Sequence, residues 1–161
     1  MTLAHLHIMI NHAPLFGVFF GAVILLVSMW FQQSFGKKIG LWILVWAALM
    51  TVPVYFSGMD AMSEVGSSSQ VSGDVMMQHK AFALWSMILT SILGLLALFP
   101  ALEKNESKKG RRITWVVLAL CALAFVLIGY TAHLGGVIRR PELRGEQLTL
   151  LQCNECKFFT A

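Results

Sequence analysis

Charged side chains are scarce in this 161-residue chain: 12% of its residues are Asp, Glu, Lys or Arg, whereas 57% are hydrophobic. A soluble domain has about 25% charged and about 45–50% apolar residues. The shortage of charge therefore excludes an ordinary soluble domain and indicates an integral membrane protein. Basic residues are also missing before the first apolar run, so we expect no cleavable signal peptide.

Several motifs of enzyme chemistry and ligand binding are missing as well. The chain has no G-x-S-x-G element and no glycine-rich phosphate loop, so neither a serine hydrolase nor a nucleotide site is indicated. No nucleic-acid motif accompanies the net charge of +4, and we expect no nucleic-acid partner. Cys153 and Cys156 form a C-x-x-C without the following His of c-type haem attachment, and we interpret them as a local disulfide.

Long apolar runs are what the chain does have. Each is close to the roughly 20 residues that a helix needs to cross a bilayer. They cover residues 13–31, 39–56, 81–100 and 113–134. We predict an all-α fold, an integral membrane four-helix bundle with up-down-up-down topology. The transmembrane domain is expected at residues 1–138, followed by a periplasmic C-terminal tail at 139–161.

The charges are divided unequally between the connections. Those near residues 32–40 and 101–112 hold seven bases and two acids, whereas the connection at 57–78 holds three acids and no Lys or Arg. The positive-inside rule then places the basic connections in the cytoplasm and both termini outside it, in a multi-pass protein of the bacterial inner membrane. We expect 57–78 to be a loop of functional length. We expect a tight first connection formed by Gly36, Lys37 and Lys38.

The histidines gather at one predicted membrane face. Three of the five lie within residues 5–14, while His79 begins the third apolar run and His133 ends the fourth. Ionisable residues inside a membrane are costly and mark functional sites by default. Because neutral imidazole is a common axial ligand of haem iron, we predict that His12, His79, His133 and His7 are metal ligands.

The spacing of the N-terminal histidines decides which pairing we expect. On a continuous helix His12 lies about 7.5 Å deeper than His7 and points about 140° away from it, unless a helix begins between them. We therefore favour His12 with His79 or His133 as the axial pair. For His7 two roles stay open, as a ligand in a second set or as part of a polar rim. For each histidine the alternative interpretation is an interfacial, solvated side chain.

Glycines and arginines near the histidines fit the haem interpretation. Gly17 and Gly21 form a small-xxx-small pair, and Gly129 lies one turn before His133. We predict cofactor contacts at Gly17 and Gly129, with plain helix packing as the alternative. We expect Gly135 and Gly136 to end the last helix.

Arg139 and Arg140 follow on the face that the positive-inside rule keeps poor in bases. Arginine binds carboxylates bidentately, so we predict that both residues are cofactor-binding and pair with haem propionates. Binding to lipid head groups is the alternative interpretation.

Four motifs together carry a family resemblance. Residues 7–14 read H-x-x-x-x-H-x-P, residues 131–136 read TAHLGG, and SGMDA at 57–61 and HKAFA at 79–83 lie between them. Over residues 5–145 the chain resembles small bacterial four-helix membrane proteins of largely uncharacterised function. The resemblance implies a four-helix membrane domain with histidines at the outer face and haem binding. Arg139 and Arg140 depart from the pattern, which has another His there, and the C-x-x-C lies outside it.

Our leading hypothesis is a b-type cytochrome-like membrane subunit holding one or two haem b groups. It relays electrons between the quinone pool and a periplasmic redox partner, such as a cytochrome, within a larger complex in contact with membrane lipid. We expect an electron-transfer subunit of an oxidoreductase rather than an enzyme alone. The alternatives are a cofactor-free structural subunit, or a copper or other transition-metal binding or transport module. The metal module uses the same histidines and Met9, Met59, Met76 and Met77.

Overall fold

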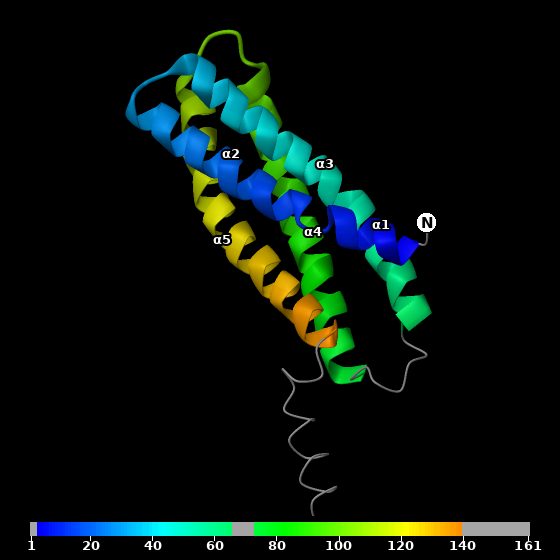
Figure 1. The fold of residues 1–161 in the computed structure, drawn as a ribbon. Helices are drawn as coiled ribbons and strands as arrows, with labels where there is room; N and C mark the ends of the chain where they lie inside the picture. The colour runs from blue at the N-terminus through cyan, green and yellow to red at the C-terminus, as the bar shows by residue number, and fades with distance from the viewer. Residues whose placement is uncertain (1–2, 66–72, 140–161) are drawn as a thin grey trace, which may run out of the picture.

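The computed structural model describes residues 3–65 and 73–139, which form five helices and no strand (Figure 1). The helices are α1 (Leu3–Ile10), α2 (Ala13–Trp30), α3 (Ser34–Val65), α4 (Gly73–Leu102) and α5 (Lys108–Arg139). The prediction of an all-helical protein is confirmed.

Four helical stretches are long and apolar enough to cross a membrane. They are His5–Trp30, Ser34–Ser63, Gly73–Leu102 and Lys108–Ile138. A helix of 30 residues is about 45 Å long, enough to pass through the roughly 30 Å hydrocarbon core and both head-group layers. Large apolar side chains point outward along these stretches, among them Leu95 and Val126. The chain is therefore a multi-pass membrane protein.

The helices extend beyond the apolar runs, which corrects three expectations. The predicted 57–78 loop is mostly helix, because residues 57–65 belong to α3 and residues 73–78 to α4. Gly36, Lys37 and Lys38 lie in the first turns of α3, and residues 31–33 make the connection instead. α5 continues through Gly135 and Gly136 to Arg139. Hydropathy marks residues at bilayer depth, whereas a helix continues wherever its backbone hydrogen bonds can form; an internal Gly costs only about 1 kcal/mol.

Four of the helices pack in a ring. α2 lies beside α3, α3 beside α4, α4 beside α5 and α5 beside α2, while α1 packs mainly on α3 (Figure 1). The helix is interrupted between α1 and α2 at Asn11 and His12. Pro14 lies in the first turn of α2. Proline is favoured there because its missing N–H has no partner in the first turn and its φ suits a helix. α1 is therefore set off from α2 by a short break, within the stretch from His5 to Trp30 that can cross the membrane.

Small residues bring α2 and α3 close together. Gly17 faces Ala47, and a Cβ added to Gly17 would lie 2.7 Å from the Ala47 Cβ. A Cβ on Gly40 would lie 2.9 Å from the backbone nitrogen of Leu25. Close backbone approach of this kind stabilises helix pairs in membranes through dispersion contacts. The core beside this seam is filled by fully buried side chains, including Val18, Leu25, Leu44, Leu93 and Val117.

The two short connections lie at the same end of the bundle (Figure 1). Lys37 Nζ, at the start of α3, lies 2.6 Å from Glu106 Oε2 in the connection between α4 and α5. Glu103 Oε1 accepts a hydrogen bond of 2.6 Å from the Ser107 hydroxyl just before α5. The histidines that come together do so at the opposite end, where α1 lies.

Candidate functional site

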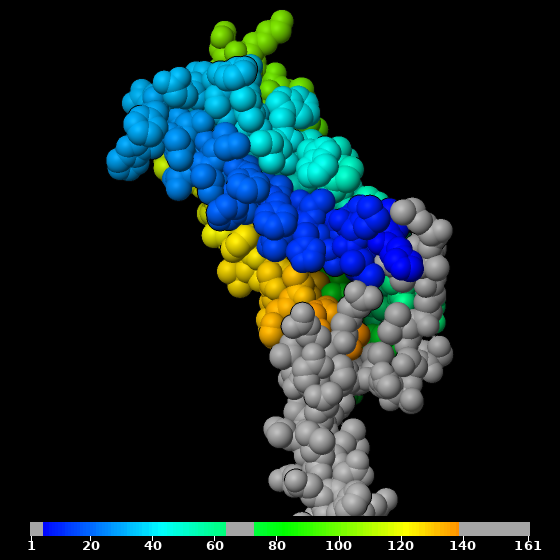
Figure 2. All heavy atoms as spheres, in the orientation of Figure 1, coloured from blue at the N-terminus to red at the C-terminus, as the bar shows by residue number. Residues whose placement is uncertain are grey.

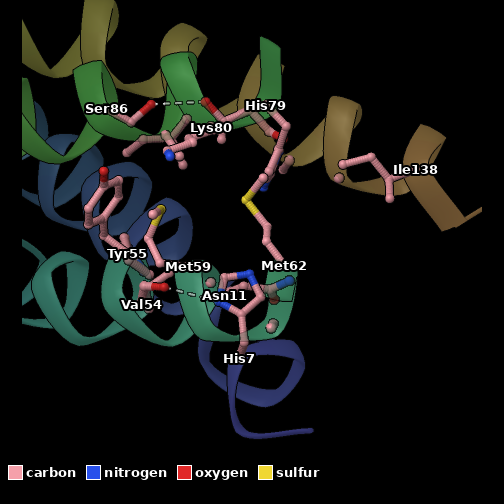
Figure 3. A pocket seen from close by; sticks show the side chains of 18 of the residues that line it. His7, Asn11, Val54, Tyr55, Met59, Met62, His79, Lys80, Ser86 and Ile138 are labelled. Atoms are coloured by element: carbon pink, nitrogen blue, oxygen red, sulfur yellow. Dashed lines mark hydrogen bonds between the residues drawn. The ribbon is translucent and has the colours of Figure 1, made fainter. Parts of the chain in front are cut away.

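A cavity of about 390 Å³ lies among α1, α3, α4 and α5, at the end of the bundle that holds α1 (Figure 3). Its wall is mostly apolar, with a few polar groups among aliphatic and methionine side chains. His7, Asn11, Tyr55, Met62, His79 and Lys80 all line it. A concave, mainly apolar cavity with a few polar groups is the usual form of a cofactor or ligand site, and such sites measure about 300–1,000 Å³.

His7 reaches the cavity from α1 and is anchored to α3. Its Nδ1 donates a hydrogen bond to the backbone carbonyl oxygen of Val54, at 3.0 Å, and lies 3.2 Å from the Ser57 hydroxyl oxygen. Because a carbonyl can only accept, this bond requires the hydrogen on Nδ1. The neutral ring then keeps its lone pair on Nε2, which is the form that ligates a metal.

His79 repeats this arrangement on the other side of the cavity. It lies on α4, and its Nδ1 donates to the backbone carbonyl oxygen of Thr131 on α5, at 2.9 Å. The Thr131 hydroxyl lies 3.0 Å from the Ser86 hydroxyl. Thr131 on α5 is thus joined to α4 by its side chain as well as by its carbonyl. His79 therefore also carries a free Nε2 lone pair.

A glycine lies under each imidazole ring. Val54 precedes Gly58 by one helical turn, and Thr131 precedes Gly135 by the same four residues. A Cβ on Gly58 would lie 2.9 Å from His7 Cε1, and a Cβ on Gly135 would lie 3.2 Å from Cε1 of the second imidazole, that of His79. Each ring thus lies close against the neighbouring helix because no side chain intervenes, and the two halves of the bundle use the same device.

The structure groups the predicted histidine ligands differently from the expected pairing. His7 and His79 line the cavity with their Nδ1 atoms anchored, whereas His12 is exposed at the rim, its ring 6.4 Å from that of Phe16. His133 is exposed and lies outside the lining. The cause is the break between α1 and α2, since His7 and His12 do not share one helix.

The other predicted contacts lie away from the cavity or beyond the described residues. Gly17 is buried between α2 and α3, and Gly129 has open space beside it and is outside the cavity lining. α5 ends at Arg139, whose side chain lies outside the described part of the chain, as do Arg140 and the C-x-x-C.

Three methionines add soft sulfur atoms to the wall. Met59, Met62 and Met76 line the cavity, whereas Met9 and Met77 are exposed. Among residues 3–65 and 73–139, no three His, Cys, Asp or Glu side chains are grouped closely enough to hold a metal ion.

Asn11 is a residue of the site that the sequence pattern did not predict. Its Oδ1 is buried at the cavity and has no hydrogen-bond partner among the described residues. Buried polar atoms without a partner are uncommon and call for a partner such as water or a ligand. The signal in the sequence was its place directly before His12 and Pro14, because Asn is favoured where a helix begins.

Comparison with known proteins found no matching protein family, curated protein or solved structure. The motif resemblance consequently stays a prediction. What can be inferred about function comes from the cavity and from the charges of the chain.

Proposed function

We propose that the protein is a membrane-bound b-type cytochrome subunit in which His7 and His79 are the axial ligands of one haem b. The observation that carries this proposal is that both imidazoles have the same protonation and the same kind of anchor. Both line one apolar cavity, and both have Nδ1 bonded to a carbonyl, which leaves Nε2 free for iron. Histidines on facing helices of a bundle are a common source of haem ligands.

The size of the cavity favours a bulky cofactor such as haem over a bare ion. The porphyrin supplies four nitrogen ligands, so two imidazoles complete six-coordination and no third protein ligand is needed. A volume of about 390 Å³ far exceeds what one copper ion occupies, so an ion alone would leave most of the cavity unfilled. Copper has one specific observation in its favour, namely the thioethers of Met59, Met62 and Met76 beside the histidines.

The chain's own residues suit electron relay better than turnover of a substrate. A haem with two imidazole ligands takes up and gives back one electron without a free coordination position. The carbonyls of Val54 and Thr131 hold the rings in orientation and raise the donor strength of Nε2. The apolar wall limits access of water, which tunes the redox potential. The protein is thus an electron-transfer subunit rather than an enzyme alone.

The charges give the orientation that we propose for it. Seven bases stand in the two short connections, so that end faces the cytoplasm and the haem end faces the periplasm. The four long helices then cross the bacterial inner membrane up, down, up and down, with both termini outside. The partners follow from this position: the quinone pool in the bilayer, a periplasmic redox protein, and other subunits of a larger complex.

The test is a reduced-minus-oxidised absorption spectrum of the purified full-length protein, with haem and copper quantified per chain. We expect a low-spin b-type spectrum and one haem per chain. His7→Ala and His79→Ala should lose that spectrum. His12→Ala and His133→Ala are matched controls, which should keep it. Copper at one ion per chain without iron, or an unchanged spectrum in both ligand variants, would overturn the proposal.

A further inference from the structure

His12 and His133 are left without a role when His7 and His79 hold the haem. Both side chains are exposed, and both lie within stretches able to cross the membrane. In lipid an imidazole must find a polar partner, and an ionisable group at membrane depth indicates a functional site. A ligand with hydrogen-bonding groups at this level would give both imidazoles a polar partner.

The helix register brings the two histidines to the same depth. The Phe19 ring of α2 contacts the Phe125 ring of α5, with centroids 5.6 Å apart, and the two helices run in opposite directions (Figure 1). Both helices rise about 1.5 Å per residue. Seven residues back from Phe19 is His12, and seven residues forward from Phe125 is Ala132 (19 − 7 = 12; 125 + 7 = 132). His12 is thus level with the neighbour of His133.

The cavity is bordered by both of these positions. His12 and Ala132 both contribute to its lining, although they lie on different helices. The cavity consequently reaches the outer side of the bundle between α2 and α5. A molecule held by His12 and His133 lies at the rim of the same cavity that His7 and His79 line.

The surface around His133 is open and has an aromatic neighbour. Gly129, one turn before it, and Gly136, about one turn after it, each have open space where a side chain would stand. The Tyr130 ring lies 6.5 Å from the His133 ring, and Phe16 lies beside His12. Aromatic neighbours attract flat rings by offset or edge contacts. Figure 2 shows this side of the bundle, where α2 (blue) meets α5 (yellow to orange).

We propose that His12 and His133 bind the head group of a membrane quinol at the lipid-facing rim of the cavity. A hydroquinone ring carries one hydroxyl on each of two opposite sides, so two imidazoles at one level on neighbouring helices can accept one O–H each. The apolar tail then lies in the bilayer along the exposed side chains of Phe16 and Phe20. The quinol would be the electron donor of the proposed cytochrome. Quinol binding stands by itself, whereas electron transfer from the quinol rests on the proposed function.

The atoms and electrons of this step balance. Oxidation of one quinol releases two protons and two electrons and leaves a quinone. The two protons pass to the imidazoles of His12 and His133 and then to periplasmic water. The two electrons would be accepted one at a time by the haem that His7 and His79 would hold, and the periplasmic redox partner would take each electron onward.

Quinone binding is tested first, without any redox reading. A short-chain quinone analogue is titrated into the purified full-length protein, and bound and free analogue are separated by equilibrium dialysis. We expect saturable binding that weakens tenfold or more in the His12→Ala/His133→Ala double variant. Gln78→Ala changes an exposed polar residue at the same end of the bundle and is the matched control. Absence of saturable binding, or equal binding by the double variant, would overturn the site.

Electron delivery is tested second, by stopped-flow reduction of the haem. The reduced analogue should reduce wild-type haem at least tenfold faster than haem in the double variant, while dithionite should reduce both equally. Equal rates with the quinol would overturn the role of the two histidines as donor site. A protein that contains no haem would defeat the proposed function alone, since the dialysis experiment still decides quinone binding.

Discussion

The Nδ1 atom of His79 lies 2.9 Å from the backbone carbonyl oxygen of Thr131, so one helix of the second hairpin holds the imidazole of the other. In an α-helix that carbonyl already accepts a bond from the N–H four residues on, and its second lone pair receives the imidazole hydrogen. The orientation of the ring is therefore fixed by backbone atoms, before any ligand arrives. His7 is held in the same way by Val54.

The glycine beneath each imidazole gives the first prediction. In Gly58→Ala the new Cβ would lie 2.9 Å from His7 Cε1, so the ring must move and its bond to Val54 must lengthen. We expect haem affinity to fall about 10-fold or more, as when the orienting partner of a ligand is lost. The measurement is haem retention during titration with a competing haem-binding protein.

Gly129→Ala is the control for that experiment, because nothing lies within 4 Å of its added Cβ. Alanine favours a helix by about 1 kcal/mol over glycine, so this variant should be at least as stable as wild type and keep its haem. If Gly58→Ala and Gly129→Ala bound haem equally well, the glycine would have no part in placing the ring.

Packing between α2 and α3 gives the second prediction. Gly40→Ala places a Cβ 2.9 Å from the Leu25 backbone nitrogen and 3.0 Å from the Gly21 carbonyl oxygen, and backbone atoms cannot rotate away. We expect a loss of about 1–3 kcal/mol in the free energy of unfolding, the usual cost of overpacking. Thermal unfolding in detergent measures it. Gly73→Ala, which has open space, is the control, and equal unfolding temperatures would contradict the close approach.

Membrane orientation gives the third prediction. In a cysteine-free background, a cysteine introduced at Asp60 should react with a membrane-impermeant maleimide in intact spheroplasts. A cysteine introduced at Lys38 should react only after the membrane is permeabilised, because the proposed orientation puts the basic end in the cytoplasm. Both positions are exposed on the protein surface, so a difference in labelling between them reports the side of the membrane and not burial within the protein. The reverse labelling pattern would place the histidine cavity at the cytoplasmic face.

The ion pair at the other end of the bundle gives the fourth prediction. Lys37 and Glu106 lie 2.6 Å apart, with 16% and 44% of their side chains exposed. Partly exposed pairs of this kind contribute about 0.2–1 kcal/mol, and salt screens them. A double-mutant cycle with Lys37→Met and Glu106→Gln should give a coupling energy in that range, smaller at high salt. A coupling energy that is unaffected by salt would contradict a partly exposed pair.

Much of the fold follows from local composition, which explains why it can be predicted. Four runs of apolar residues require four helices within the bilayer, because a backbone in lipid must satisfy its hydrogen bonds internally. The positions at which α3 ends, α4 begins and α5 ends could not be predicted from the apolar runs. Residues 57–65 and 73–78 are too polar for the bilayer core, yet their Met, Ala, Glu and Gln residues favour a helix.

The amino-acid sequence by itself determined that this is a four-span membrane protein with histidines at one end and basic residues at the other. Only the tertiary structure decided which histidines share a cavity. The direction of a side chain depends on where its helix begins and on what its neighbour leaves open. The break at Asn11 sends His7 inward and leaves His12 at the rim, and Gly58 and Gly135 make room for the inner rings. Those contacts join residues about fifty positions apart, which periodicity within one helix cannot reveal.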